Sequence, residues 1–236
     1  MVKYIYEYKN WTDFTWRETD INAIFGEVRN VQGKIIGQMN MLGFAAKEEA
    51  SLSTLTLDVI KSSEIEGEKL DYNQVRSSIA RRLGINIAGL VPTNRNIDGV
   101  VEMMLDATQN YQKPLTNKRL YAWHSALFPT GHSGMHKIEV GRYRSGEMQI
   151  VSGALGKEKA HFEAVPAKRV KEEMDNFLKW FNDNSPIDPI LKTAIAHFWF
   201  IIIHPFDDGN GRIARAISDL MLARADQTTE RYYSMS

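Results

Sequence analysis

The sequence has no cysteine among its 236 residues. This absence excludes a disulfide framework, a zinc–thiolate site and a cysteine nucleophile. Long apolar runs are also missing, because the longest, residues 198–203, is far shorter than the roughly 20 residues that a membrane-spanning helix needs. The N-terminus lacks the apolar stretch and the small-residue cleavage site of a secretory signal. We therefore expect a cytoplasmic protein that has no membrane partner.

An excess of charge of either sign is missing as well. Lys and Arg together number 29, and so do Asp and Glu, which gives a formal net charge of zero at pH 7. Because nucleic-acid-binding domains usually carry a strong basic excess, nucleic acid is not expected as a partner. Gly and Pro, at 16 and 7 residues, are too few for a low-complexity chain. A chain of this length with 43% hydrophobic residues can bury an ordinary core.

Apolar residues recur at steps of three and four along most of the chain, which predicts an all-α fold. Asp71 and Thr116 have the chemistry of helix N-caps, and Gly84 that of a helix C-terminus. The helix that ends near residue 202 is apolar on nearly all sides, which is typical of the buried centre of an all-α domain. The predicted helices span residues 21–42, 47–63, 71–83, 97–111, 116–127, 170–181 and 189–202.

Residues 130–162 depart from this helical pattern. Glycine recurs there six times, and Met148 to Val151 has the character of a strand, so we expect a loop and one β-hairpin. A second break, at residues 86–96, contains Gly89 and Pro92 and is the best candidate for a boundary. It would divide an N-terminal helical region, residues 1–90, from a core over residues 95–236.

One segment carries most of the chemistry: residues 204–215 read HPFDDGNGRIAR. Pro205 tends to end the preceding helix at His204, while Gly209 and Gly211 allow the loop to turn and to approach a ligand closely. The next helix begins near Gly211, so its free N–H groups and the positive end of its dipole face the loop. The backbone alone therefore predicts an anion-binding site.

The side chains of this segment add the chemistry of a phosphate site. Arg212 and Arg215 are three residues apart, share one helix face and suit the oxygens of a polyphosphate. Asp208 offers a hard oxygen ligand to Mg²⁺. His204 has an imidazole that can take a proton from an incoming hydroxyl.

These residues resemble the motif of the Fic family, HPFx[D/E]GNGRxxR, at every position. The resemblance extends from about residue 95 onward and implies a helical fold with one β-hairpin flap. Most members of the family are adenylyltransferases that move AMP from ATP to a Ser, Thr or Tyr hydroxyl of a target protein. The resemblance implies that His204 is the base and that Asp208 holds Mg²⁺. It also implies nucleotide-binding roles for Gly209, Asn210 and Gly211 as an anion hole and for Arg212 and Arg215 as contacts of the outer phosphates.

A second element resembles the family's inhibitory pattern, [S/T]xxxE[G/N]. Residues 62–67 read SSEIEG, so Ser62 and Glu66 share a helix face and Gly67 ends the helix. The resemblance implies that Glu66 pairs with Arg215 and blocks a productive position of the γ-phosphate. Because the pattern precedes the core, it resembles the class whose inhibitory helix is in cis. The simpler interpretation is a solvated carboxylate at a helix end.

The resemblance also implies a flap that docks the target in extended form by strand addition. We expect this flap over Glu147, Met148, Gln149, Ile150 and Val151. The predicted function is therefore an autoinhibited, Mg²⁺-dependent protein adenylyltransferase that uses ATP. Three alternatives are left open: removal of AMP, transfer of UMP or phosphocholine, and a non-catalytic nucleotide-binding module. A homo-oligomer is left open too, and since Fic cores usually continue beyond the helix of the motif, we expect this core to be incomplete at its C-terminal end.

Overall fold

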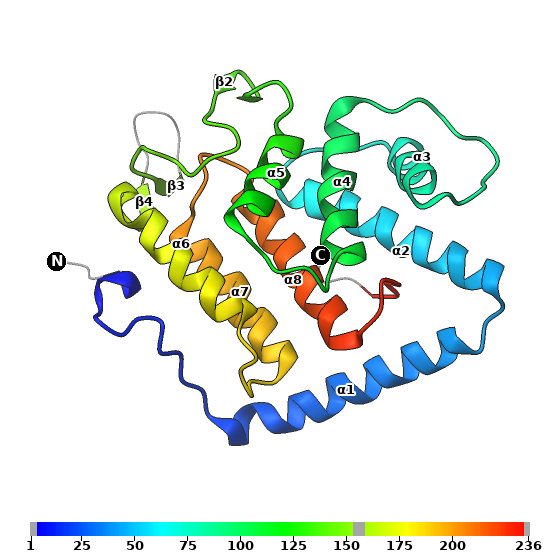
Figure 1. Ribbon diagram of the computed structural model, residues 1–236, viewed down its shortest axis with the longest axis horizontal. Coiled ribbons are helices and arrows are strands. Elements are labelled where there is room, and N and C mark those ends of the chain that lie inside the picture. Colours follow the sequence, from blue (N-terminus) through cyan, green and yellow to red (C-terminus); the bar gives the residue numbers. More distant parts are fainter. Residues whose placement is uncertain (1–3, 153–158, 234–236) are drawn as a thin grey trace.

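The computed structural model describes residues 4–152 and 159–233, which fold mostly into helices (Figure 1). This confirms the predicted all-α fold with a β-hairpin. A short 3-10 helix, η1 (Ile5–Glu7), precedes the other elements. Within the described residues these follow in the order α1 (Glu18–Asn40), α2 (Phe44–Ile65), α3 (Tyr72–Leu83), α4 (Arg95–Gln109), α5 (Asn117–Leu127), β1 (His132–Ser133), β2 (His136–Lys137), β3 (Gln149–Ser152), β4 (Lys159–Glu163), α6 (Ala167–Asn182), α7 (Pro189–Ile203) and α8 (Asn210–Asp226).

Polar caps begin two helices where the sequence predicts them. The Asp71 carboxylate accepts the backbone N–H of Gln74 at 2.9 Å and begins α3, which ends at Gly84 in the left-handed conformation (φ 71°). The Thr116 hydroxyl accepts the N–H of Arg119 at 3.2 Å and begins α5. A cap of this kind satisfies one of the first N–H groups of a helix, so a short local signal determines the boundary.

The helices α7 and α8 form the centre of the molecule and lie side by side, joined by a short loop (Figure 1). The side chains of Ile213, Ile217 and Leu220 in α8 are fully buried. On the other side of α8 lie α4 and the end of α2, while α6 packs on α7. Because α8 is enclosed in this way, the loop that precedes it is held from several sides.

The apolar helix α7 is buried on most of its surface. Trp199, Phe200 and Ile203 are buried, but Phe198 is 46% exposed and makes an edge contact with Phe14 of the N-terminal segment. The expectation of a helix buried at the centre therefore applies to most of α7, and the segment that precedes α1 covers part of its remaining face.

The helix α1 extends along one side of the molecule, and none of its residues is buried (Figure 1). Ile24, Val28 and Val31 of the predicted apolar stripe are 41–58% exposed. An ion pair at 2.9 Å between Arg29 and Asp188 ties the helix to the start of α7. The predicted helix is present, but the described residues do not bury its stripe.

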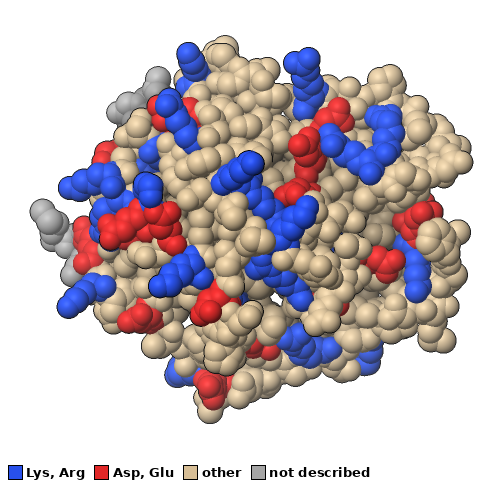
Figure 2. All heavy atoms as spheres, in the orientation of Figure 1, with Lys and Arg blue, Asp and Glu red and all other residues tan. Residues whose placement is uncertain are grey.

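None of the helices within residues 4–152 and 159–233 combines the length and the apolar character that a membrane crossing requires. Figure 2 shows Lys and Arg interspersed with Asp and Glu over the visible face. Neither sign of charge dominates that face, in keeping with the zero net charge of the sequence.

Candidate functional site

The loop between α7 and α8 begins with a strained residue. His204 follows the last turn of α7 in the left-handed conformation (φ 49°, ψ 61°), which costs a residue with a side chain on the order of 1 kcal/mol. Its N–H donates to the carbonyl of Phe200 at 2.9 Å, and Pro205 prevents the helix from continuing. This backbone turns the chain sharply toward the start of α8.

Two residues hold the loop in its shape. The N–H of Phe206 donates to Oδ1 of Asn210 at 3.0 Å, and Nδ2 of Asn210 donates back to the Phe206 carbonyl at 2.8 Å. Gly209 has φ 78°, and a Cβ atom there would lie 2.8 Å from the ring of Phe128. The side chain of Asn210 therefore stabilises the loop, and its backbone N–H at the start of α8 is the group that can face an anion.

The imidazole of His204 has the chemistry of a base. Its Nδ1 lies 3.3 Å from the carbonyl of Ile201, and because a carbonyl only accepts, Nδ1 carries the proton and Nε2 has the free lone pair. Burial lowers the pKa of His204; the Ile201 carbonyl opposes this shift, Arg144 adds to it, and Asp208 and Glu66 oppose it. A neutral imidazole near pH 7 can accept the proton of a hydroxyl.

Asp208 supplies the carboxylate of the loop. It accepts the N–H of Gly209 at 2.5 Å and the hydroxyl of Ser133 in β1. Its neighbour Asp207 instead accepts the N–H of Glu139 at 2.8 Å and so ties the loop to the segment after β2. In phosphate sites Mg²⁺ uses one or two carboxylates together with phosphate oxygens and water, and Asp208 fits that donor set.

The end of α2 holds Arg215. Nε of Arg215 donates to the Ser62 hydroxyl at 2.7 Å, and Nη2 donates to the Ser62 carbonyl at 2.8 Å and to Glu66 at 2.7 Å. A Cβ atom on Gly211 would lie 2.1 Å from Oε1 of Glu66, so glycine leaves the room that this carboxylate occupies. The structure thus brings Ser62, Glu66 and Arg215 together, and Glu66 is paired rather than simply solvated.

A second carboxylate at the same end of α2 contacts the other arginine of the loop. Nη1 of Arg212 donates to Glu68 at 2.8 Å, and the guanidinium lies over the ring of Phe128 at 5.1 Å. Arg212 is only 3% exposed. No local signal in the sequence predicts this pair, because Glu68 appears there as one more residue of an acidic run. Both arginines proposed as phosphate clamps therefore face carboxylates from the end of α2.

The predicted flap overlaps the hairpin of β3 and β4, which pair antiparallel. Gln149, Ile150 and Val151 lie in β3, whereas Glu147 and Met148 precede it. The Glu147 carboxylate accepts the backbone N–H at the start of α6 at 3.2 Å, and the Met148 carbonyl accepts the N–H of residue 164 at 3.0 Å. The strand is thus shifted by one residue from the expected Met148 to Val151. Glu147 connects the hairpin to α6, and Met148 pairs with the residue that follows β4.

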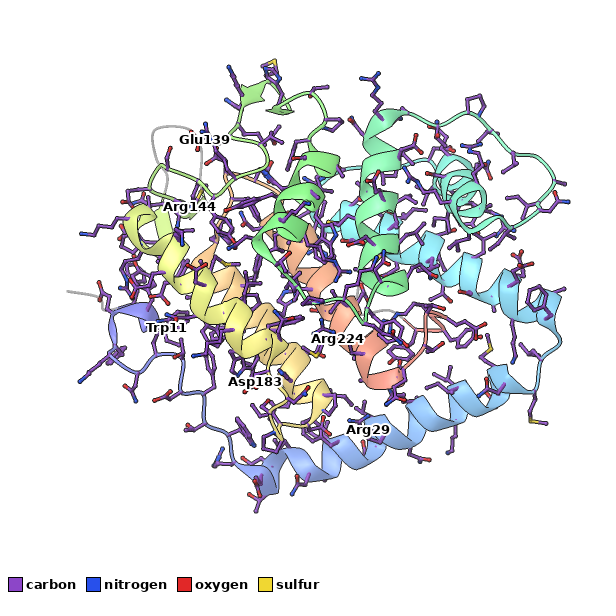
Figure 3. The ribbon with its side chains drawn as sticks, in the orientation of Figure 1. Trp11, Arg29, Glu139, Arg144, Asp183 and Arg224 are labelled. Atoms are coloured by element: carbon purple, nitrogen blue, oxygen red, sulfur yellow. The ribbon has the colours of Figure 1, made fainter. Side chains whose placement is uncertain are left out.

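Arg144 is a residue of this region that sequence reasoning missed. Its side chain, labelled in Figure 3, is 3% exposed. Nε donates to the carbonyl of His204 at 2.7 Å. Nη1 donates to the carbonyl of Gly146 at 2.7 Å. Burial lowers the pKa of Arg144. A single arginine in a glycine-rich stretch has no periodicity, so no local signal could have predicted its burial.

Fold and site together define a class: a helical protein in which two central helices are joined by a glycine-containing loop that begins with a histidine and leads into the N-terminus of a buried helix. Comparison with family models narrows this class. The model described as "Fic/DOC family" matches residues 114–222, and the model described as "Domain of unknown function (DUF4172)" matches residues 4–85. The chain therefore carries a Fic/DOC family domain preceded by a DUF4172 region.

Curated relatives share this domain. The "Protein adenylyltransferase fic-1" of Caenorhabditis elegans is 36% identical over 90 residues, which cover 37% of this chain and 16% of that protein. The protein of the same name from Caenorhabditis briggsae is 29% identical over 178 residues, covering 73% of this chain and 32% of the relative. The matches thus span less than a third of the length of these two relatives.

A solved structure shows the same fold. The crystal structure of a Fic family protein from Desulfovibrio desulfuricans G20 aligns with a TM-score of 0.59 at 26% sequence identity. The alignment covers 91% of this chain and 60% of that one. The likeness therefore includes the N-terminal helices as well as the helices around the loop.

Proposed function

We propose that this chain is an Mg²⁺- and ATP-dependent protein adenylyltransferase that the end of α2 holds inactive. The observation that carries the proposal is the position of His204, a neutral base at the end of α7 whose Nε2 is free, beside the N-terminus of α8. The names of the curated relatives support the same activity.

The proposed reaction moves AMP to a hydroxyl of a target protein. Nε2 of His204 takes the hydroxyl proton as the hydroxyl oxygen attacks the α-phosphorus of ATP. The new P–O bond forms, the bond to the bridging oxygen of the β-phosphate breaks, and pyrophosphate leaves. The first N–H groups of α8 and the guanidinium groups of Arg212 and Arg215 would hold the phosphates. Asp208 would hold Mg²⁺, which supplies neutralisation of the phosphate charge.

Inhibition would follow from competition for Arg215. The guanidinium already donates to Glu66 and to Ser62, so it cannot also bind a γ-phosphate in the same geometry. Charge-assisted hydrogen bonds of this kind contribute about 1.5–3 kcal/mol. A bias of that size disfavours the productive pose of ATP by about 10–100-fold.

The position of the label in ATP tests the proposed reaction. The Glu66→Gly protein is incubated with Mg²⁺, a lysate and ATP labelled at either the α- or the γ-phosphate. We expect protein-bound label from the α-phosphate alone, and no label when His204→Ala is added. Glu64→Gly is the matched control, because Glu64 lies on the same turn but pairs with Lys61 at 2.7 Å.

Three outcomes would contradict the proposal. Label from the γ-phosphate would indicate a kinase. Binding of ATP without transfer by Glu66→Gly would indicate a nucleotide-binding module. Release of AMP from a previously modified target, without the forward reaction, would indicate an enzyme that removes AMP.

A further inference from the structure

Arg144 lies in the segment between β2 and β3, and its guanidinium is surrounded by backbone carbonyls. Nε donates to His204 at 2.7 Å, Nη1 donates to Gly146 at 2.7 Å, and Nη2 donates to Ile203 at 3.3 Å. Nη2 also donates to the carbonyl of Val165. One side chain thus satisfies four acceptors, and Figure 3 labels it near the end of the molecule where the β3–β4 hairpin meets α6.

These acceptors belong to three separate segments of the chain. Ile203 and His204 end α7, where the last carbonyls lack helical partners and the helix dipole is negative. The backbone N–H of Arg144 also donates to the carbonyl of Pro205 at 2.9 Å. Gly146 precedes β3 and Val165 follows β4. Arg144 therefore connects the backbone of the loop to both ends of the hairpin.

The charge of Arg144 is not balanced by an ion pair among the described residues. Burying a cation without such a pair is unfavourable, so its hydrogen bonds to carbonyls must compensate. Only arginine offers five donors in one rigid plane, whereas lysine offers three donors at a single point. The geometry therefore selects the shape of the guanidinium as well as its charge.

We propose that Arg144 is a positioning residue, which fixes the position of the β3–β4 hairpin relative to the backbone of His204. A target segment bound to the hairpin would then lie next to Nε2 of His204. The inference rests on the proposed function. Its physical basis is that His204 has a strained backbone and that its own carbonyl accepts from Arg144. A shift of about 1 Å between a base and its substrate can cost about 100-fold in rate.

The proposal separates the protein target from ATP. Loss of the connection should lower kcat and raise KM for the target, because it moves the base relative to the hairpin. KM for ATP should stay unchanged, since the phosphate contacts come from α8. A side chain needed only for folding would affect both substrates alike.

The kinetic test compares two substitutions in the Glu66→Gly protein. Arg144→Lys should lower kcat/KM for the target by about tenfold or more, with KM for ATP within about twofold of the parent. Arg142→Lys is the matched control and should change neither, because Arg142 is exposed and pairs with Glu139 at 2.9 Å. An Arg144→Lys protein with the parent's kcat/KM would overturn the proposal, and so would an equal loss toward both substrates.

NMR titration of the His204 imidazole provides a readout that needs no turnover. Arg144, Asp208 and Glu66 are the charged groups that shift the pKa of His204, and Arg144 is the one that lowers it. The midpoint should therefore be higher in Arg144→Gln than in wild type, and unchanged in Arg144→Lys. If Glu66→Gly transfers no AMP, the proposed function fails, and the titration midpoint alone tests whether Arg144 acts on His204. An unchanged midpoint in Arg144→Gln would overturn the inference.

A measurement on the wild-type protein covers the case in which the substituted proteins do not fold. Nε–H of Arg144 is buried and donates to His204, whereas the side chain of Arg142 is 67% exposed. We expect the Arg144 signal in an arginine Nε–H spectrum to exchange with water far more slowly than that of Arg142. Equal exchange rates would overturn the proposed connection.

Discussion

Among single residues, His204 combines features that suit a base. Its backbone is strained, its carbonyl accepts from Arg144, and its Nδ1 faces the carbonyl of Ile201. Each of these contacts restricts the imidazole without using Nε2. The residue is therefore oriented by the backbone around it, and its one free nitrogen is available for chemistry.

Replacing His204 separates catalysis from nucleotide binding. In the Glu66→Gly protein, His204→Ala should reduce AMP transfer by about 10²–10⁴-fold, the range typical of a general base. Binding of ATP should persist, because the proposed phosphate contacts come from α8. Single-turnover transfer and calorimetric titration with ATP measure the two effects. The exposed His136 offers a control, His136→Ala, and undiminished transfer by His204→Ala would remove His204 from the base role.

A second histidine, His124, packs against the loop between α7 and α8. Nδ1 of His124 accepts the N–H of Gly141 at 3.1 Å, and its ring stacks on Phe206 at 4.3 Å. Burial lowers the pKa of His124 to about 4. Histidine in the unfolded chain titrates near 6.5, so as the pH falls the unfolded state binds the proton first. The stability that His124 contributes is thus present above pH 6.5 and is lost as the pH falls toward 4.

The pH dependence of unfolding tests this role of His124. Between about pH 7 and pH 5, this residue should cost the wild type about 2 kcal/mol of unfolding free energy. His124→Gln should remove that part of the loss, and His136→Gln should leave it in place. Urea unfolding at the two pH values gives the comparison. The same loss in wild type and His124→Gln would contradict a neutral His124.

At the scale of elements, the end of α2 acts on α8 through two contacts. Glu66 pairs with Arg215 at 2.7 Å and Glu68 pairs with Arg212 at 2.8 Å. Arg212 and Arg215 are three residues apart and share one face of α8, so the end of α2 can contact both of them. We expect the second pair to be weaker than the first, because the side chain of Glu68 is 46% exposed and water screens its charge.

Glu68→Gln should therefore have a small effect with a definite sign. Freeing Arg212 for phosphate should tighten ATP binding by about threefold, within the range of a solvent-exposed ion pair. Calorimetric titration with ATP and Mg²⁺ measures this change. Glu64→Gln, in the last turn of α2, should leave the affinity unchanged. Weaker binding of ATP by Glu68→Gln would show that Glu68 supports the site instead of blocking it.

The elements that could be predicted from the sequence are those with local signals. The starts of α3 and α5 follow from Asp71 and Thr116, because a cap acts on residues only three positions away. The pair of Glu68 and Arg212 joins residues 144 positions apart, and only the packing of α2 on α8 creates it. The family resemblance predicts the cluster of Ser62, Glu66 and Arg215, whereas spacing alone does not connect α2 to α8.

At the scale of the whole molecule, the segment after α8 folds back onto α8. Arg231 is 1% exposed, and its Nη2 donates to Asp219 at 2.8 Å, while Nη1 lies 3.8 Å from Asp226. Burial raises the pKa of Asp219, the charge of Asp58 on α2 adds to this, and the charge of Arg231 opposes it. The cation of Arg231 thus sits where α2 and α8 bring buried carboxyl groups together.

Removing this cation should destabilise the fold. Arg231→Met leaves Asp219 and Asp226 without their cationic partner, and losing one member of a buried pair costs about 3–5 kcal/mol. Urea unfolding measures the loss. Arg17→Met should change stability by less than about 0.5 kcal/mol, because the Arg17 side chain is 86% exposed. A loss below about 1 kcal/mol for Arg231→Met would show that the segment contributes little.

The arrangement of the N-terminal segment could not be predicted. Trp11 contacts Trp199 edge to face at 5.7 Å and is buried, although nothing in its local sequence pattern indicates a partner. The period of α1 predicts an apolar stripe, and the structure leaves Val28 and Val31 exposed. Periodicity indicates that one face of a helix is apolar, whereas the element that packs on that face depends on the whole fold.

The carboxylate of Glu66 occupies Arg215 in the structure, and a comparison of turnover tests whether this contact restrains AMP transfer. AMP transfer to a target is measured for wild type and Glu66→Gly at saturating ATP and Mg²⁺, with Arg215→Ala added to each. We predict about 10–100-fold faster transfer by Glu66→Gly, and no such gain in proteins that carry Arg215→Ala. Equal turnover by wild type and Glu66→Gly would show that Glu66 does not restrain transfer and is an ordinary paired carboxylate at a helix end.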